Sequence, residues 1–168
     1  DGYANTTLMA IAPTKSSSFI HGAVSMGIEP IKSNYFIKDL AKSKTVYKNP
    51  FLEAQLEKYG LNNTKTWQSI LKKDGSVQHL DFPNKAVFKS FVEISPKEIV
   101  LQAAQRQKYI DQSQSLNLMI DPSVSAKDIN KLYMYAWEEG VKTLYYQFSK
   151  SSAQDFARNI LECSSCEG

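Results

Sequence analysis

The sequence predicts an α/β fold in which helices alternate with buried strands. Two well-marked helices are each followed by an apolar stretch: residues 95–108 precede Ser113–Ile120, and residues 125–139 precede Val141–Phe148. This alternation is typical of sheets whose faces are covered by helices. The chain of 168 residues can bury one sizeable core, and its hydrophobic content of 42% is ordinary for a globular protein.

The charge and hydropathy patterns exclude several classes of protein. Lys and Arg number 20 against 17 Asp and Glu, so the net charge is only +3, and the basic residues are scattered. A nucleic-acid-binding protein concentrates them into a patch that displaces phosphate counterions. No apolar run approaches the roughly 20 residues that span a bilayer, and residues 1–5 do not resemble a secretory signal. We therefore expect a cytoplasmic protein that binds neither nucleic acid nor membrane.

The first third of the chain contains short elements. Thr6–Ala12 is an apolar run that predicts a buried strand, and Pro13 ends it. The polar turn Thr14–Ser18 then leads into a short helix capped by a hydroxyl. Tyr35–Leu40 and Lys44–Lys48 predict a hairpin.

Three helical segments are expected in the middle of the chain. Residues 49–59 begin with Asn-Pro and are followed by Gly60, a residue typical of helix ends. Thr64–Lys72 predicts a second helix, closed by the turn Asp74-Gly75. Pro83–Phe91 predicts a third.

The two later helices carry the clearest signals. Ser95-Pro96-Lys97-Glu98 has the pattern of a capping box, with proline in the first helical position. Ser125 opens the other helix, and its apolar residues recur at helical spacing and predict one core-facing side: Ile129, Leu132, Tyr133, Ala136 and Trp137. Beyond residue 149 the hydrophobic pattern fades, so residues 150–168 are predicted to be a flexible tail.

The first feature with chemical potential is the turn Pro13–Ser18 between a strand and a helix start. Free backbone N–H groups and clustered hydroxyls at a helix start can bind phosphate, and Lys15 adds a positive charge. The alternative is that these residues only cap the helix, which is common for Ser and Thr.

The second feature is the pair Tyr145-Tyr146. Tyrosine can lose an electron and a proton together, so neighbouring tyrosines can relay a radical. The alternative is that Leu144, Tyr146 and Phe148 simply form the buried face of a strand, where aromatic residues are favoured. Successive side chains of a regular strand point to opposite faces. A relay therefore requires the strand to end or distort at the pair, so that the two rings meet.

The third feature is Cys163-Ser164-Ser165-Cys166. Two thiols at this spacing can close and reopen a disulfide by thiol exchange. Zinc is the usual competitor, but a tetrahedral site needs four ligands, and His21 and His79 are far away in sequence. We therefore favour redox exchange over metal binding, and treat both histidines as ordinary residues.

Five segments, in the same order along the chain, resemble the large subunit of class I ribonucleotide reductases. They are Asn5–Ser18, Gly27-Ile28-Glu29-Pro30, Tyr109–Asn117, Trp137–Tyr146 and the tail with Cys163 and Cys166. The resemblance implies the C-terminal part of a ten-stranded α/β barrel in residues 1–149, and a flexible redox-shuttle tail in residues 150–168.

The resemblance also implies roles for the three features. Thr14, Lys15, Ser16 and Ser17 would hold the diphosphate of a ribonucleotide, although some members of the family have an acidic residue where this chain has Lys15. Residues 145–146 would relay a radical, as in class I and not in the cobalamin-dependent class II. The two tail cysteines would pass electrons from thioredoxin or glutaredoxin to the active site.

The same resemblance implies partners. A diiron-type radical cofactor is expected in a small subunit, and none in this segment. The substrate-attacking thiyl cysteine would lie on another chain or in an upstream part, because the only two cysteines here are in the tail. A gene split by a mobile element, as in phage genomes, is one hypothesis. The alternatives are a noncatalytic module that associates with a reductase without turnover and a thioredoxin-like oxidoreductase, which the serine-rich setting of the cysteines disfavours.

Overall fold

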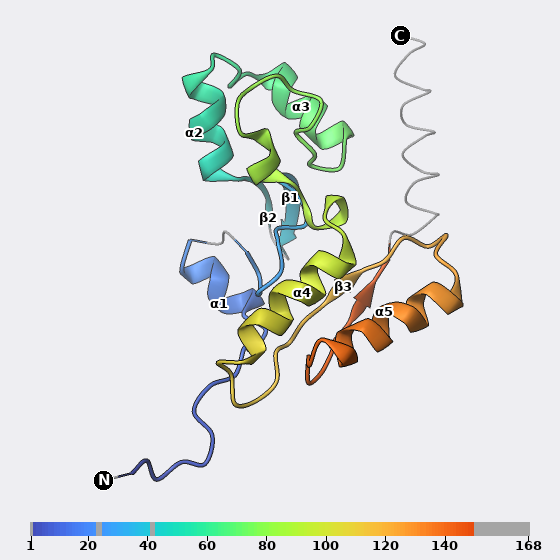
Figure 1. The fold of residues 1–168 in the computed structure, drawn as a ribbon. Helices are drawn as coiled ribbons and strands as arrows, with labels where there is room; N and C mark the ends of the chain where they lie inside the picture. The colour runs from blue at the N-terminus through green and yellow to red at the C-terminus, as the bar shows by residue number, and fades with distance from the viewer. Residues whose placement is uncertain (1, 23–24, 41–42, 150–168) are drawn as a thin grey trace. The chain divides into compact units, whose positions relative to one another are not determined.

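The computed structural model describes residues 2–22, 25–40 and 43–149 (Figure 1). The chain divides into two compact units. We call Pro13–Ser95 the insert unit, and Asp1–Ala12 together with Pro96–Gly168 the strand unit. In chain order the insert unit lies between the first segment of the strand unit and its first helix, which the sequence analysis did not anticipate.

The insert unit contains most of the elements that the sequence predicts for its residues. A short helix comes first, then an antiparallel hairpin, then two helices: α1 (Lys15–Ile20), β1 (Tyr35–Leu40), β2 (Ser43–Lys48), α2 (Pro50–Lys58) and α3 (Thr64–Lys72). The hairpin and the two helices α2 and α3 are confirmed almost to the residue, because turn and cap residues mark their ends.

Asparagine side chains begin both of these helices. Asn49 Oδ1 accepts hydrogen bonds from the amides of Phe51 and Leu52, at 3.1 and 3.4 Å. Asn63 Oδ1 accepts from the amide of Thr66 at 3.0 Å. Each bond satisfies an N–H that has no acceptor within the helix.

The prediction of a helix over Pro83–Phe91 is wrong in type. The segment forms two short 3₁₀ helices, η1 (Lys85–Phe88) and η2 (Phe91–Glu93). Asn84 adopts a left-handed conformation with φ of 60°, so an α-helix cannot continue through it. The Glu93 carboxylate then accepts from the amide and hydroxyl of Ser90, which starts η2 separately.

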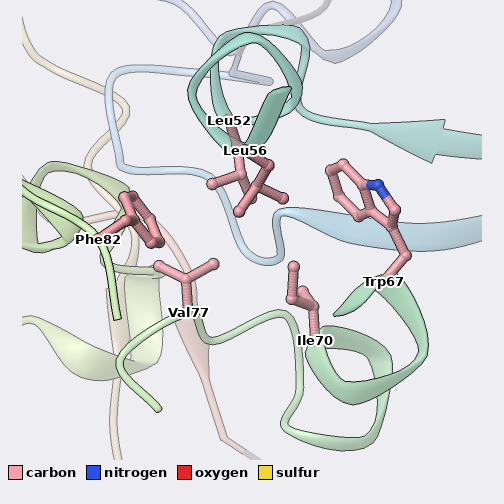
Figure 2. Close-up of a cluster of buried hydrophobic side chains, with 6 residues drawn as sticks. All are labelled: Leu52, Leu56, Trp67, Ile70, Val77 and Phe82. Atoms are coloured by element: carbon pink, nitrogen blue, oxygen red, sulfur yellow. The ribbon is translucent and has the colours of Figure 1, made fainter. Parts of the chain in front are cut away.

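The hydrophobic core of the insert unit lies between α2, α3 and the loop that follows them (Figure 2). Six buried side chains point toward one another: Leu52, Leu56, Trp67, Ile70, Val77 and Phe82. Since a fully buried aliphatic or aromatic side chain contributes roughly 1.5–3 kcal/mol by leaving water, this cluster is the main stabilising element of the unit.

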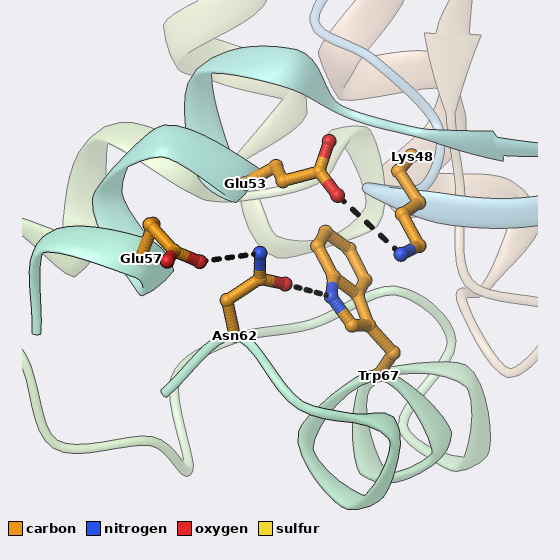
Figure 3. A network of polar contacts seen from close by, with 5 residues as sticks. All are labelled: Lys48, Glu53, Glu57, Asn62 and Trp67. Carbon is orange, nitrogen blue, oxygen red and sulfur yellow. Dashed lines mark hydrogen bonds and ion pairs between the residues drawn. The ribbon is translucent and has the colours of Figure 1, made fainter. Parts of the chain in front are cut away.

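A polar network surrounds the one tryptophan of this core (Figure 3). The indole N–H of Trp67 donates to Asn62 Oδ1 at 2.8 Å, and Asn62 in turn donates to the Glu57 carboxylate at 2.8 Å. On the other side, Lys48 Nζ lies 4.9 Å from the ring centroid and 3.4 Å from a carboxylate oxygen of Glu53. The network therefore links β2, α2 and α3 around the buried indole of Trp67, whose N–H has a hydrogen-bond acceptor.

The strand unit has the α/β pattern that the sequence predicts. Its elements are α4 (Pro96–Gln107), β3 (Leu118–Met119), α5 (Ala126–Glu138) and β4 (Gln147–Phe148). The two strands pair in parallel, with α5 between them in the chain, so they form a strand–helix–strand crossover. The helices α4 and α5 pack against each other, and α4 also contacts β3.

The predicted strands are shorter than expected, and one is not buried. Thr6–Ala12 forms a single parallel bridge, between Ile11 and Gln114, and Leu8 and Met9 are exposed. Among the described residues, only residues 112–115 pair with this segment, so its side chains lack the cover that buries a parallel strand on both faces. Val141–Phe148 likewise forms a strand only at its last two predicted residues.

The buried side-chain amides of Gln107 and Gln114 connect residues 110–114 to α4. Gln114 Nε2 donates to the carbonyl of Ala103 and to Gln107 Oε1, at 2.8 and 3.1 Å. Gln107 Nε2 donates to the carbonyls of Ile110 and Gln112. Both glutamines are buried, and each bond replaces one that water would otherwise supply.

The predicted core-facing side of α5 is only partly correct. Leu132 and Ala136 are buried, but Tyr133 is exposed and Trp137 keeps 71% of its surface accessible. The buried stripe is thus narrower than the sequence pattern indicates. The described strands do not close a barrel, and no described helix is long and apolar enough to cross a membrane.

Candidate functional site

The tyrosine pair lies immediately before β4, alongside the segment that leads into β3. The main chain of both tyrosines is fixed by this neighbour. The amide of Tyr145 donates to the carbonyl of Leu116 at 2.8 Å, and the carbonyl of Tyr146 accepts from the amide of Leu118 at 2.9 Å. Both tyrosines therefore belong to a segment whose main chain is hydrogen-bonded to residues 116 and 118.

The pairing is irregular at the two tyrosines. In a regular parallel ladder, Tyr146 would bond through both its N–H and its C=O, with Leu116 and Leu118 as partners. Here the carbonyl of Leu116 accepts from Tyr145 instead, and the amide of Tyr146 donates to the side-chain oxygen of Asn117 at 3.1 Å. Two tyrosines thus stand opposite one residue, which is the definition of a β-bulge.

The bulge accompanies direct contact between the two rings. Their centroids are 4.2 Å apart, with 54° between the ring planes. The expectation that the strand must distort to bring the rings together is therefore confirmed. The competing interpretation, a buried strand face, is wrong for Tyr146, because 58% of its surface and 50% of that of Tyr145 are exposed.

The Tyr146 side chain also influences the protonation of Tyr145. A hydrogen bond with the Tyr146 side chain, its charge when ionised and a smaller effect of burial hold the pKa of Tyr145 above the ordinary value of a tyrosine. Tyr145 is therefore a neutral phenol at physiological pH, and its oxidation must release a proton as well as an electron.

Further aromatic and polar groups adjoin the pair. The ring of Phe148 lies 6.2 Å from that of Tyr146, and the hydroxyl of Tyr133 on α5 donates to Gln147 Oε1 at 3.4 Å. The tyrosines are thus the start of an aromatic cluster that continues into β4.

The predicted phosphate turn forms the start of α1. Thr14 is the N-cap, and its carbonyl accepts from the amide of Ser18 at 2.8 Å. Its own amide donates to the carbonyl of Met26 at 3.3 Å, and no side-chain cap bond is formed. The amides of residues 15–17 belong to the first helical turn, so they have no acceptor within the helix.

The Gly27-Ile28-Glu29-Pro30 motif directly follows Met26, whose carbonyl accepts from the amide of Thr14. A side chain on Gly27 would meet the carboxylate of Glu29, since an added Cβ would lie only 2.8 Å from Glu29 Oε2. The hydroxyl of Ser25 donates to the carbonyls of Gly27 and Glu29, at 3.1 and 2.6 Å. Because the carboxylate of Glu29 is the far end of a flexible side chain, Glu29 would have to shift to accommodate a Cβ at position 27.

Sequence reasoning missed one polar clamp in the strand unit. A single carboxylate oxygen of Asp111 accepts from the successive amides of Leu8 and Met9, at 2.8 and 3.0 Å. Gln112 Nε2 donates to the hydroxyl of Thr7 at 2.8 Å. The clamp holds the first extended segment, which leads directly into the phosphate turn. No spacing rule predicts it, because the partners are more than 100 residues apart.

The structure does not place the remaining candidate residues relative to these. Cys163 and Cys166 lie outside the described residues, and the side chains of Lys15 and Ser16 are not described. Tyr145 and Tyr146 belong to the strand unit, and the phosphate turn to the insert unit. In the described part of the chain, no group of three or more His, Cys, Asp or Glu side chains is placed to hold a metal ion.

His79 has a more specific environment than the sequence indicates. Its Nε2 lies 2.9 Å from the hydroxyl of Ser69, and that hydroxyl donates to the carbonyl of Thr66 at 2.7 Å. Partial burial, followed by the nearby Lys73 and Lys85, lowers the pKa of His79 below its ordinary value. Since the serine proton is used by a carbonyl, the pair is not an activated nucleophile.

The parallel strands β3 and β4, joined in the chain through α5, give the strand unit an α/β architecture. A family model described as the ribonucleotide reductase barrel domain matches residues 1–147. The chain therefore belongs to the ribonucleotide reductase barrel family, as its sequence motifs indicate.

Individual relatives agree with this assignment. The chain is 39% identical over 154 residues to a ribonucleoside-diphosphate reductase large subunit of Invertebrate iridescent virus 6, covering 86% of this chain and 16% of the relative. It is 36% identical over 154 residues to a reductase subunit alpha of Chlamydia muridarum, covering 90% of this chain and 14% of the relative.

A solved structure is also similar. It is the class Id ribonucleotide reductase alpha subunit of Actinobacillus ureae, with 54% identity and a TM-score of 0.80 over 89% of this chain and 28% of that one. The chain thus spans less than a third of each of these three proteins.

Proposed function

We propose that this chain is the C-terminal working part of a ribonucleoside-diphosphate reductase, which reduces ribonucleotides to deoxyribonucleotides by radical chemistry. The observation that carries the proposal is the contact between the rings of Tyr145 and Tyr146 at a strand bulge. An ordinary buried strand would separate these rings onto opposite faces. Their exposure leaves them accessible to a partner chain that supplies the radical.

In this proposal the tyrosines pass a hydrogen atom equivalent from one phenol to the next. One phenol loses an electron and a proton and becomes a tyrosyl radical, while its neighbour regains both and returns to a neutral phenol. The ring contact would favour the electron transfer, and the neighbouring phenol would exchange the proton. The diiron-type cofactor that generates the radical would belong to a small subunit.

The turn at Thr14–Ser17 would bind the diphosphate of the substrate. The amides of the first α1 turn and the hydroxyls of Thr14, Ser16 and Ser17 are donors suited to phosphate oxygens, and Lys15 would add a charge. Replacing Thr14 and Ser16 by alanine is then expected to raise the KM for the ribonucleoside diphosphate. An unchanged KM would show that these residues do not bind the substrate and act only as helix caps.

Cys163 and Cys166 would carry electrons from thioredoxin or glutaredoxin to the active site. The thiyl cysteine would be supplied by another chain or an upstream part, since both cysteines of this chain are assigned to the shuttle. Cys163→Ser is expected to stop thioredoxin-driven multiple turnover and to spare a single turnover, because the first reduction uses cysteines outside this chain. Continued thioredoxin-driven multiple turnover in Cys163→Ser would contradict the shuttle role.

The central experiment reconstitutes the chain with the rest of the large subunit and the small subunit. Tyr145→Phe and Tyr146→Phe are each expected to abolish formation of deoxyribonucleotides and to leave assembly intact, because phenylalanine keeps the ring and removes the oxidisable phenol. Normal turnover in either variant would contradict the relay. If the unmodified chain assembles and no turnover occurs, the alternative of a noncatalytic module holds.

A further inference from the structure

The bulge at the tyrosine pair leaves one main-chain N–H without an acceptor in the ladder, and the side chain of Asn117 supplies that acceptor. A bulge adds a residue whose main-chain N–H has no acceptor in the ladder. Here that N–H belongs to Tyr146, because the carbonyl of Leu116 is taken by Tyr145. Asn117 Oδ1 accepts from it at 3.1 Å, in place of a main-chain carbonyl.

Asparagine is well suited to this position. Its short side chain commonly bonds to nearby backbone groups that lie outside a regular ladder. Asn117 is also the residue that stands opposite the two tyrosines, so its side-chain oxygen reaches the added N–H directly. Leucine at this position would have a similar volume and no acceptor.

The regular ladder is the competing arrangement of the same strands. In it the amide of Tyr146 would donate to the carbonyl of Leu116, and the two tyrosine side chains would point to opposite faces. The rings can contact each other only in the bulged arrangement. Whatever stabilises the bulge over the regular ladder therefore controls the ring contact.

We propose that Asn117 is a positioning residue for the tyrosine pair: its side chain holds the amide of Tyr146, stabilises the bulge and so keeps the two rings in contact. The proposal gives a role to a residue for which neither the sequence motifs nor the proposed relay had one. Its consequence for turnover rests on the proposed function, whereas its consequence for the ring geometry does not.

One other local feature is a rival cause of the bulge. The amide of Leu116 donates to the carbonyl of Gln114 at 2.9 Å, so the neighbouring strand is itself kinked just before the tyrosines. If this kink alone shifts the ladder, the bulge persists without Asn117. The two causes are therefore separated by a substitution that removes only the side-chain acceptor.

The experiment compares Asn117→Leu with Asn117→Asp in the chain reconstituted with its reductase partners. Asn117→Leu removes the acceptor, and Asn117→Asp retains it. Structures of both complexes by electron cryomicroscopy give the distance between the ring centroids, and turnover is measured in the same preparations. Asn130→Leu, a change at an exposed asparagine of α5, is the matched control.

We expect the ring contact to be lost in Asn117→Leu and kept in Asn117→Asp and in the control. Turnover in Asn117→Leu is expected to fall by about 100-fold, the usual effect of misplacing a reacting group by an ångström. Rings that stay in contact in Asn117→Leu would overturn the proposal and assign the bulge to the Gln114 kink. Lost contact with undiminished turnover would support the positioning role and instead refute the relay.

As a further readout, the phenol of Tyr145 is titrated by NMR in the isolated chain. Its pKa is raised mainly by the hydrogen bond with Tyr146, so separation of the rings should return the pKa toward that of an ordinary tyrosine. Tyr146→Phe sets the value expected for complete loss of the partner. Asn117→Leu should approach that value, and Asn117→Asp should not. A pKa in Asn117→Leu identical to that of the unmodified chain would count against the proposal.

Discussion

Asn34 connects four segments of the insert unit and is fully buried. Its Nδ2 donates to the carbonyls of Gly75 and Phe88, at 2.9 and 2.7 Å, and its Oδ1 accepts from Asn49 Nδ2 at 2.9 Å. The segments after α3, at η1 and before α2 are therefore all tied to the residue that precedes β1. Asn34→Leu keeps the approximate volume of the side chain and removes all three bonds.

The expected loss of stability follows from these three bonds. Each contributes about 1 kcal/mol net, and burial of a partner left without a hydrogen bond adds to that cost. Asn34→Leu should therefore lower the free energy of unfolding by roughly 3–4 kcal/mol, which is a large share of the ~5–15 kcal/mol typical of a domain. The N-cap of α2 would weaken too, because Asn49 would lose a contact that orients its side chain.

Guanidinium unfolding of the chain, followed by tryptophan fluorescence, measures this effect. Trp67 lies in the core of the insert unit and Trp137 is exposed in the strand unit, so a Trp137→Phe background makes Trp67 the only reporter. Asn130→Ala, at an exposed helix position in the other unit, is the control and should leave the Trp67 transition unchanged. A loss below about 1 kcal/mol in Asn34→Leu would refute the reasoning, since it would equal one exposed hydrogen bond and not three buried ones.

Two further predictions concern the clamp on the first segment and the histidine. Asp111→Ala should speed hydrogen exchange at the amides of Leu8 and Met9 about tenfold, because loss of their shared carboxylate acceptor costs roughly 1.4 kcal/mol. Unchanged exchange would show that Asp111 does not hold this segment. The pKa of His79 is lowered, so this residue favours folding while neutral and its contribution falls as the pH drops through about 6.5, the value in an unfolded chain. Lys73→Gln should raise the pKa of His79 in an NMR titration, and no change would show that Lys73 does not contribute to the lowered pKa.

Local signals allowed much of the insert unit to be predicted from the sequence. Asn49-Pro50 and Gly60 mark the ends of α2, and the Asp74-Gly75 turn after α3 has positive φ at both residues, as its composition indicates. A side chain at Gly75 would collide with the backbone of Ser33, which explains the glycine. The error at Pro83–Phe91 was avoidable in part, because Ser90 and Glu93 have the spacing of a capping box.

Strand pairing was harder to predict because it depends on distant residues. The apolar character of residues 6–12 and 141–148 indicates strands, but their lengths depend on partners that no local pattern specifies. The bulge at Tyr145-Tyr146 is a further case. The sequence shows that a distortion is required for ring contact, whereas the identity of Asn117 as the acceptor depends on the register between two segments almost 30 residues apart.

The segment 112–120 has a particular importance for the proposed chemistry, because it pairs on both sides. One side bonds to residues 9–11, which continue directly into the phosphate turn, and the other bonds to residues 145–148, which carry the tyrosines. Different residues of this one segment thus set the register of the chain entering one proposed site and of the residues forming the other. Substitutions along this segment should therefore affect the tyrosine contact and the first extended segment separately. A change at Asn117 should affect the tyrosine contact. A change at Asp111, just before this segment, should affect the residues that lead to the phosphate turn.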